Sequence, residues 1–241
     1  DNQRFDECSI EELIDFLRHN YLSCKVELFD GSPLLKQLKE REKLDKSFFE
    51  SEYQFITSIA QLAFYWQPLM VKNQLLDKDS ANYVFSSFNS TVTAHNMFLL
   101  EYQQEMAENQ NIINIFCDFQ YFFGQTENLF RNYSTLDCFF KNKIKYFDFQ
   151  TKLDNIIKSS NNKSRETFFY LFFLPISRLN DFHEFILKIA PLTPSFFMDH
   201  LYIDKAKTLC KNYIDKVKAF LVVKPTVFNE ICINHLFGVL N

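Results

Sequence analysis

The sequence has 241 residues, of which 47% are hydrophobic and 23% are charged, and its formal net charge at pH 7 is -4. A chain of this length and apolar content can bury a sizeable core, which excludes an intrinsically disordered protein. Its Lys and Arg residues form no cluster of the density that phosphate backbones require, so nucleic acid is not an expected partner.

Residues 1–45 are expected to form a lead-in of short elements. Ser9 begins a capping box in front of a short amphipathic helix, and residues 24–30 (CKVELFD) fit a brief strand. Ser32-Pro33 has the N-cap and N1 order that starts a further helix. We expect this lead-in to flank or cover the main body.

From Lys46 onward the apolar residues recur every three or four positions, which is the period of amphipathic helices. Long helices are expected from Lys46, at about 79–106, 109–130, 167–190 and 195–221, with a broken helical stretch up to 159. The predicted fold class is therefore all-α, an elongated bundle of about six long helices. The bundle is predicted to span residues 46–222, and residues 223–241 form an apolar tail that can dock as a short helix.

The helix expected at 167–190 contains Pro175, where a helix must bend or restart. After the proline, apolar residues such as Leu179 and Phe182 share one face. A polar stripe lies on the other side: Ser177, Asp181, Glu184 and Lys188. The stripe fits either a solvated helix face or a protein interface.

No conventional enzyme site is found in the sequence. Three isolated glycines cannot build a phosphate-binding loop, and there is no HExxH, no GxSxG and no Cys/His cluster with metal-ligand spacing. The six cysteines lie far apart without a CxxC pair, which favours reduced core residues. We therefore expect no cofactor, no metal and no covalent catalysis.

The longest apolar run, Phe168 to Ile176, is about half the length that a membrane-spanning helix needs. The first residues also lack the basic and apolar pattern of a signal peptide. A cytoplasmic location is expected, with recruitment to a membrane or to the cytoskeleton left open.

Two stretches resemble motifs of the Dbl-homology (DH) domain, the exchange-factor module for Rho-family GTPases. Residues 51–59 (SEYQFITSI) are similar to the pattern Thr-Glu-x-x-Tyr-Val-x-x-Leu of its first helix, and Pro68-Leu69 follows. Residues 175–188 (PISRLNDFHEFILK) are similar to its Pro-Val-Gln-Arg-Ile-x-x-Tyr stretch, and Thr193-Pro194 follows. The resemblance covers about residues 46–221, and the order and spacing of the motifs agree.

The resemblance implies a guanine nucleotide exchange module for a Rho/Rac-family small GTPase. Such a module binds the nucleotide-free GTPase more tightly than the loaded form, and by reciprocity it weakens nucleotide binding. Membrane contact is expected only through a flanking domain outside this chain. The implied GTPase-binding residues are Ser47, Glu50, Ser51, Gln54, Ser177, Arg178, Asp181, Glu184, Lys188, Lys211 and Asp215. Reversing the charge of Arg178 together with Lys188 is expected to weaken binding without unfolding the chain.

Three of these positions depart from the family. Ser47 stands where the resembled family has a Glu for the first switch, Asp181 replaces a Lys, and Asp215 aligns with an Asn. Losing a buried polar partner at an interface costs about 2–5 kcal/mol. Glu50 and Asp45 are near enough in sequence to replace the acid that is missing at Ser47.

Two hypotheses therefore stand. The first is an atypical exchange factor, and the second is a catalytically inactive scaffold that binds a GTPase or another protein through the same face. Under either hypothesis, the lead-in or the tail could cover this face as an autoinhibitory element. The sequence does not specify which GTPase is bound.

Overall fold

The structure is a computed structural model that describes residues 33–108, 112–159, 165–195 and 197–221. In these ranges all regular secondary structure is helical, which confirms the predicted all-α class. None of the helices in them is long and apolar enough to span a bilayer. The short helix expected after Ser9, the strand expected at 24–30 and the tail at 223–241 lie outside the described residues.

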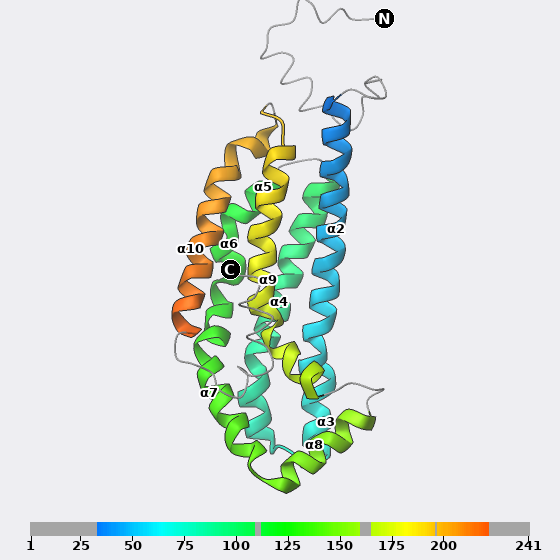
Figure 1. The fold of residues 1–241 in the computed structure, drawn as a ribbon, viewed down its shortest axis with the longest axis vertical. Coiled ribbons are helices and arrows are strands. Elements are labelled where there is room, and N and C mark those ends of the chain that lie inside the picture. The colour runs from blue at the N-terminus through cyan, green and yellow to red at the C-terminus, as the bar shows by residue number, and fades with distance from the viewer. Residues whose placement is uncertain (1–32, 109–111, 160–164, 196, 222–241) are drawn as a thin grey trace, which may run out of the picture.

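In the described ranges five long helices form an elongated bundle, whose arrangement Figure 1 shows. They are α2 (Pro33–Gln61), α4 (Lys78–Glu108), α7 (Glu127–Ile144), α9 (Arg165–Ile189) and α10 (Ile203–Leu221). Shorter elements join them: η2 (Leu62–Trp66), α3 (Gln67–Lys72), α5 (Ile112–Ile115), η3 (Phe116–Asp118), α6 (Phe119–Phe123), η4 (Gly124–Thr126), α8 (Phe147–Ser159), η5 (Ala190–Leu192) and η6 (Met198–Tyr202). Helix α9 packs against α2 on one side and α10 on the other, so these three helices form one face of the bundle (Figure 1).

Helix α2 begins at Pro33, as the Ser32-Pro33 signal predicts, and continues without a break to Gln61. The boundary predicted between residues 45 and 46 therefore falls inside this helix. The reason is that Arg41 and Asp45 are buried on the same side of α2 as Phe48, so the helix packs on the bundle well before Lys46.

The single helix expected at 109–130 is replaced by short α and 3-10 segments. At one of these breaks, the carbonyl of Phe123 accepts hydrogen bonds from the hydroxyls of Thr126 (2.7 Å) and Tyr213 (2.5 Å). These hydroxyls compete with backbone N–H groups for the Phe123 carbonyl. The spacing of apolar residues does not show such competition, so the interruption of the helix was not predicted.

Aromatic rings fill much of the core. Phe48 stacks on Phe185 with ring centroids 4.1 Å apart, and Phe98 packs on Phe182 at 5.3 Å. Stacked and tilted ring pairs of this kind add to the hydrophobic gain of burying the rings. At the other end of the bundle Trp66, the one tryptophan of the sequence, is fully buried against Phe168 at 4.8 Å.

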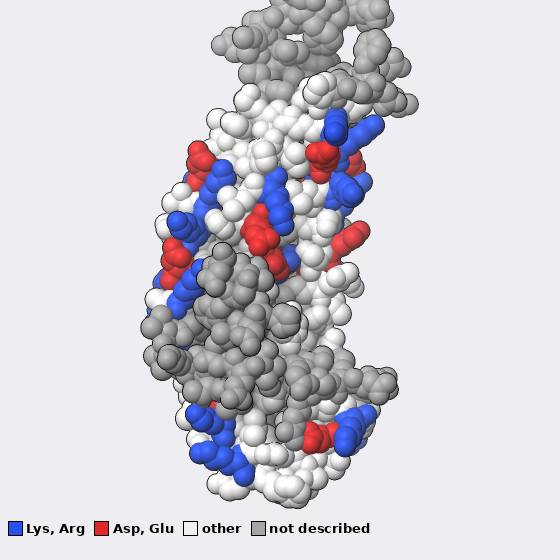
Figure 2. Space-filling view, in the orientation of Figure 1, with Lys and Arg blue, Asp and Glu red and all other residues white. Residues whose placement is uncertain are grey.

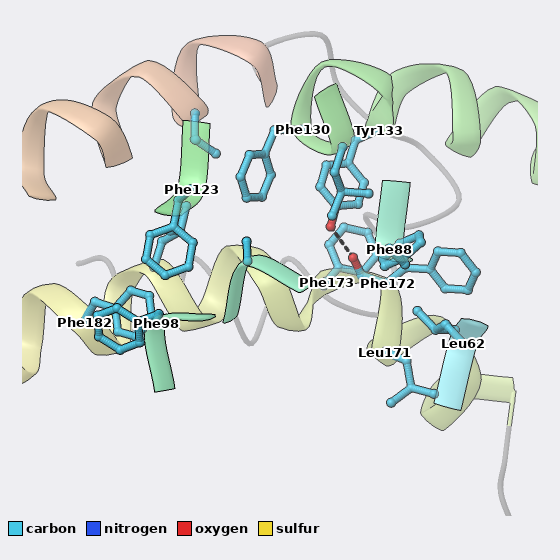
Figure 3. Close-up of a cluster of buried hydrophobic side chains, with 14 of the residues drawn as sticks. Leu62, Phe88, Phe98, Phe123, Phe130, Tyr133, Leu171, Phe172, Phe173 and Phe182 are labelled. Carbon is cyan, nitrogen blue, oxygen red and sulfur yellow. Dashed lines mark hydrogen bonds between the residues drawn. The ribbon is translucent and has the colours of Figure 1, made fainter. Parts of the chain in front are cut away.

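Pro175 lies inside α9, as the sequence suggested. Because it has no N–H, it cannot donate to the carbonyl of Leu171 one turn earlier, and its ring crowds that carbonyl. The next carbonyl, that of Phe172, accepts a hydrogen bond from the hydroxyl of Tyr133 on α7 (Figure 3). A side chain from a neighbouring helix thus supplies a donor where the proline disturbs the backbone ladder.

Candidate functional site

The face made by α2, α9 and α10 carries most of the residues predicted to contact a GTPase. Charged side chains follow all three helices on the side shown in Figure 2. The exposed members of the predicted set are Ser47, Glu50, Gln54, Asp181, Glu184, Lys188, Lys211 and Asp215, while Ser51 and Ser177 are half-buried. Arg178 alone of the set is buried.

Arg178 reaches inward from α9 and joins it to α2. Its Nε donates to Glu52 Oε2 at 2.6 Å, and its Nη2 lies 3.5 Å from the carbonyl oxygen of Phe48. The guanidinium also lies over the rings of Phe48 (4.8 Å) and Phe182 (5.1 Å), a cation–π arrangement. Arg178 therefore holds two helices of the face together from below.

Glu52 is fully buried and is bound from a third helix as well. Its Oε1 lies 2.6 Å from Nδ1 of His95 on α4, and the His95 ring packs on Phe55 (4.5 Å) and Phe123 (4.6 Å). Burial alone would raise the pKa of Glu52, but His95 and Arg178 outweigh it and hold that pKa below its ordinary value. The carboxylate is ionised and joins α2, α4 and α9.

The expectation that Arg178 belongs to the exposed contact surface is thereby corrected. Removing one partner of a buried ion pair costs about 3–5 kcal/mol, because the other charge is left uncompensated. An acid at position 178 would in addition lie against Glu52, so the double charge reversal at Arg178 and Lys188 would not leave the fold intact. In this structure Arg178 is buried and supports the face from the inside.

Two polar contacts on α9 lie at the surface. Asp181 Oδ2 lies 3.4 Å from Nη1 of Arg178, and burial raises the pKa of Asp181 while Arg178 opposes that rise. Lys188 Nζ is 3.0 Å from Glu184 Oε2, an exposed pair one turn apart. An exposed pair such as Lys188 with Glu184 contributes little to stability. Both of these side chains can therefore pair with a partner protein instead.

His183 marks the junction between α9 and α10. Its partial burial, together with the positive charges of Lys211 and Lys218, lowers its pKa, while Asp215 acts in the opposite direction. These charges act on His183 because α9 and α10 pack against each other. The predicted residues Lys211 and Asp215 therefore belong to the same face as Glu184 and Lys188.

Along the first half of α2 an open groove of about 460 Å³ follows one side of the helix. It is lined by Lys39, Glu42, Lys43, Lys46, Ser47 and Glu50. Of the two acids proposed to replace the one missing at Ser47, Glu50 is exposed in this groove. The other, Asp45, is buried.

Asp45 belongs to a second buried polar cluster. Its Oδ1 accepts from the hydroxyl of Tyr102 at 3.3 Å, and its Oδ2 lies 3.8 Å from Nε of Arg41. Arg41 also pairs with Asp199, whose Oδ1 accepts from the backbone N–H of Ile113 at 2.9 Å. Burial raises the pKa of Asp45 from 3.8 to about 7 despite the nearby Arg41. This carboxyl is a packing element and is not available to a partner.

Glu52 and His95 were not among the predicted site residues, although the helical spacing placed both on apolar faces. Glu52 shares the buried face of α2 with Phe48, Phe55 and Ile59, at helical spacing. His95 likewise shares the apolar face of α4. An acid and an imidazole on two buried faces predict an internal polar contact, because neither is tolerated there without a partner. Among the described residues no group of three or more His, Cys, Asp or Glu side chains could hold a metal ion.

No protein-family model and no curated protein matches the sequence. Solved structures do match its fold. The DH domain of FARP2 is 11% identical with a TM-score of 0.67, covering 76% of this chain and 90% of that one. The DH/PH domain of human ARHGEF11, in a ternary complex with human RhoA and its inhibitor, is 14% identical with a TM-score of 0.64, covering 77% of this chain and 55% of that one.

The PDZ-RhoGEF DH/PH domains in complex with GTP-γ-S-activated RhoA are also 14% identical, with a TM-score of 0.63, covering 77% of this chain and 54% of that one. The chain therefore spans about half the length of these two DH/PH chains. Identities this low show likeness of fold alone. On that evidence the chain has the fold of a Dbl-homology domain.

Proposed function

We propose that this chain is a guanine nucleotide exchange module for a Rho-family small GTPase. The proposal rests on the DH fold together with the α2, α9 and α10 face, where the predicted contact residues gather. Two of the similar structures are complexes with RhoA, which supports a GTPase of this family as the partner.

The observation that carries the proposal is the way in which this face is built. Its supporting residues, Glu52, Arg178 and His95, are buried and joined at 2.6 Å, while its outer side chains are exposed and weakly paired. A preorganised surface loses little conformational entropy when it binds. More of the binding energy then remains to favour the nucleotide-free GTPase over the loaded one.

Exchange requires that difference to be large. An equilibrium is shifted from 1:99 to 99:1 by a preference of about 10⁴-fold, or about 5.5 kcal/mol, for one state over the other. Charged groups that become buried at the interface are the means by which a few residues supply such an amount. We assign the first-switch contact to Glu50, one turn beyond Ser47 on the same groove, because Asp45 and Glu52 are both bound inside the bundle.

The departures at Asp181 and Asp215 define the expected partner. Asp181 places a carboxylate, which accepts, where the resembled family has a donating Lys. Asp215 replaces an Asn, which can donate as well as accept, with an acceptor. A GTPase with basic or hydroxyl side chains in its second switch suits this face, whereas one with an acid there would be repelled.

The test is the release of a fluorescent guanine nucleotide from a panel of Rho-family GTPases, with and without the protein. We expect faster release from at least one member and a loss of at least tenfold in that acceleration with Glu50→Gln. Asp148→Asn is the matched control, since Asp148 is an exposed helical acid on α8, away from the face. No acceleration by folded protein across the panel would refute the proposal.

The same departures at Asp181 and Asp215 favour one alternative, a scaffold that binds without exchange. Its signature would be equal affinity for the loaded and the nucleotide-free GTPase, because a ligand that prefers neither state shifts no equilibrium. Measuring both affinities with the same protein therefore separates the two functions.

A further inference from the structure

The second half of α2 and the facing part of α4 carry no charged side chain. No Lys, Arg, Asp or Glu occurs from Tyr53 to Val71 or from Ser80 to Leu100, in a sequence that is 23% charged. In Figure 2 the part of the lower half of α2 that grey atoms do not cover is white, whereas its upper half carries both signs of charge. Charged residues are thus missing from one region of the molecule, formed by residues 53–71 and 80–100.

These two uncharged segments lie side by side. Phe55, Ile56 and Ile59 of α2 form an apolar cluster with Val92 and Leu99 of α4. The contact of Glu52 with His95 and that of Gln67 with Asn82 (3.0 Å) set an antiparallel register between the helices. The outer residues of both segments are therefore level with one another along the bundle.

Large apolar side chains are exposed on this uncharged region. On α2 and η2 they are Tyr53 (62% exposed), Phe64 (72%) and Tyr65 (42%), and on α4 they are Tyr83 (50%), Met97 (43%) and Leu100 (66%). Exposed aromatic residues and methionine combined with a lack of charge are the composition of the centre of a protein interface. A lipid surface is a poorer match, because no Lys or Arg is present to hold anionic headgroups.

We propose that this surface, the outer faces of residues 53–71 and 80–100, binds a second copy of the same chain. A two-fold dimer brings a patch against itself, so like charges on the patch would oppose one another. This patch has none, although the chain as a whole has a net charge of -4. The uncharged surface is therefore compatible with a second copy of itself. A partner with charged side chains would have to bury them against this surface without counter-charges.

The size of the surface also fits a weak dimer. At 1.5 Å rise per residue, the segment from Tyr53 to Val71 is about 28 Å long, and two adjacent helices give a width of about 20 Å. Two such faces bury roughly 1,100 Å² in total, which is near the lower limit of specific interfaces. Interfaces of this size are typical of weak, transient complexes, so we test for a dissociation constant in the micromolar range. This inference does not depend on exchange activity.

The test is sedimentation velocity of the full chain over about 1 to 100 µM, which spans the expected dissociation constant. We expect a monomer–dimer equilibrium, and Phe64→Glu or Leu100→Glu should raise the dissociation constant at least tenfold. Leu201→Glu is the matched control, because Leu201 is equally exposed (67%) but lies on η6. It should leave dimerisation unchanged.

Amide hydrogen exchange of the unmodified chain gives a reading that does not depend on any variant. Residues 53–71 and 80–100 should exchange more slowly at the high concentration than at the low one. A monomer at every concentration would overturn the inference. So would a dimer that survives both Phe64→Glu and Leu100→Glu, since its interface would then lie elsewhere.

Discussion

Replacing Arg178 with methionine tests whether the candidate face is held from within. Met keeps most of the aliphatic volume of Arg but removes the guanidinium that lies 2.6 Å from Glu52 and stacks over Phe48 and Phe182. Glu52 would then stay fully buried. Of its side-chain partners Arg178 and His95, only His95 would remain. The variant separates the supporting role of Arg178 from any direct contact with a GTPase.

The expected loss of stability follows from this burial. Breaking a buried ion pair by removing one partner costs about 3–5 kcal/mol, a large part of the 5–15 kcal/mol that typically stabilises a folded domain. With a urea m-value of about 2.5 kcal/mol/M, the midpoint of unfolding should fall by about 1.5 M. Lys188→Met is the control, since Lys188 is an exposed residue of the same helix and should change stability by less than about 0.5 kcal/mol.

Urea unfolding followed by circular dichroism measures both variants. The double variant Glu52→Gln with Arg178→Met should recover part of the loss, because no uncompensated carboxylate would remain. A loss below about 1 kcal/mol for Arg178→Met would contradict this supporting role of Arg178. It would mean that Glu52 finds compensation elsewhere, and that Arg178 is free to be assigned to the partner surface after all.

Three other predictions concern separate parts of the molecule. The pKa of Asp45 is raised from 3.8 to about 7, so the unfolded chain loses this proton first and stability falls as the pH rises between these values. Asp45→Asn should therefore gain stability relative to the unmodified chain at about pH 8 and gain none at about pH 4; a pH-independent difference in urea midpoints would contradict this. Tyr133→Phe removes the donor to the carbonyl of Phe172 and should cost about 1–2 kcal/mol in the same assay, whereas a neutral effect would show that the proline site needs no such donor. Lys211→Ala removes a positive charge that lowers the pKa of His183, so an NMR titration should show that pKa rising; an unchanged value would place α10 away from α9.

Much of the fold could be predicted from the sequence. The helical period from Lys46 onward located α4 and α9 closely, and the two motifs pointed to the DH fold that the solved structures share. The helix expected at 195–221 ends as predicted, but α10 begins only at Ile203, because the 3-10 segment η6 precedes it. The start of α2 at Pro33 was predicted, but the boundary between the lead-in and the bundle was set at residues 45 and 46, inside that helix. Arg41 and Asp45 interrupt the apolar period although both are buried. In the sequence alone Arg41 looks like a surface residue, because its buried partner Asp199 lies far away along the chain.

The candidate site was predictable as a face but not residue by residue. Spacing along α9 correctly separated the exposed Asp181, Glu184 and Lys188 from the buried Leu179 and Phe182. It could not show that Arg178 turns inward. That requires the position of Glu52, which lies more than a hundred residues away and on another helix.

The burial of Trp66 gives this chain an internal optical probe. It is the one tryptophan of the sequence, it packs on Phe168 at the start of α9, and its Nε1 has no hydrogen-bond partner among the described atoms. An indole in such an apolar site emits at short wavelength, and its emission moves to the red when water enters. Tryptophan fluorescence therefore reports on the contact between η2 and the start of α9 alone, whereas the far-ultraviolet circular dichroism signal reports on every helix. If the two signals change together in urea, the two ends of the long bundle unfold as one cooperative unit.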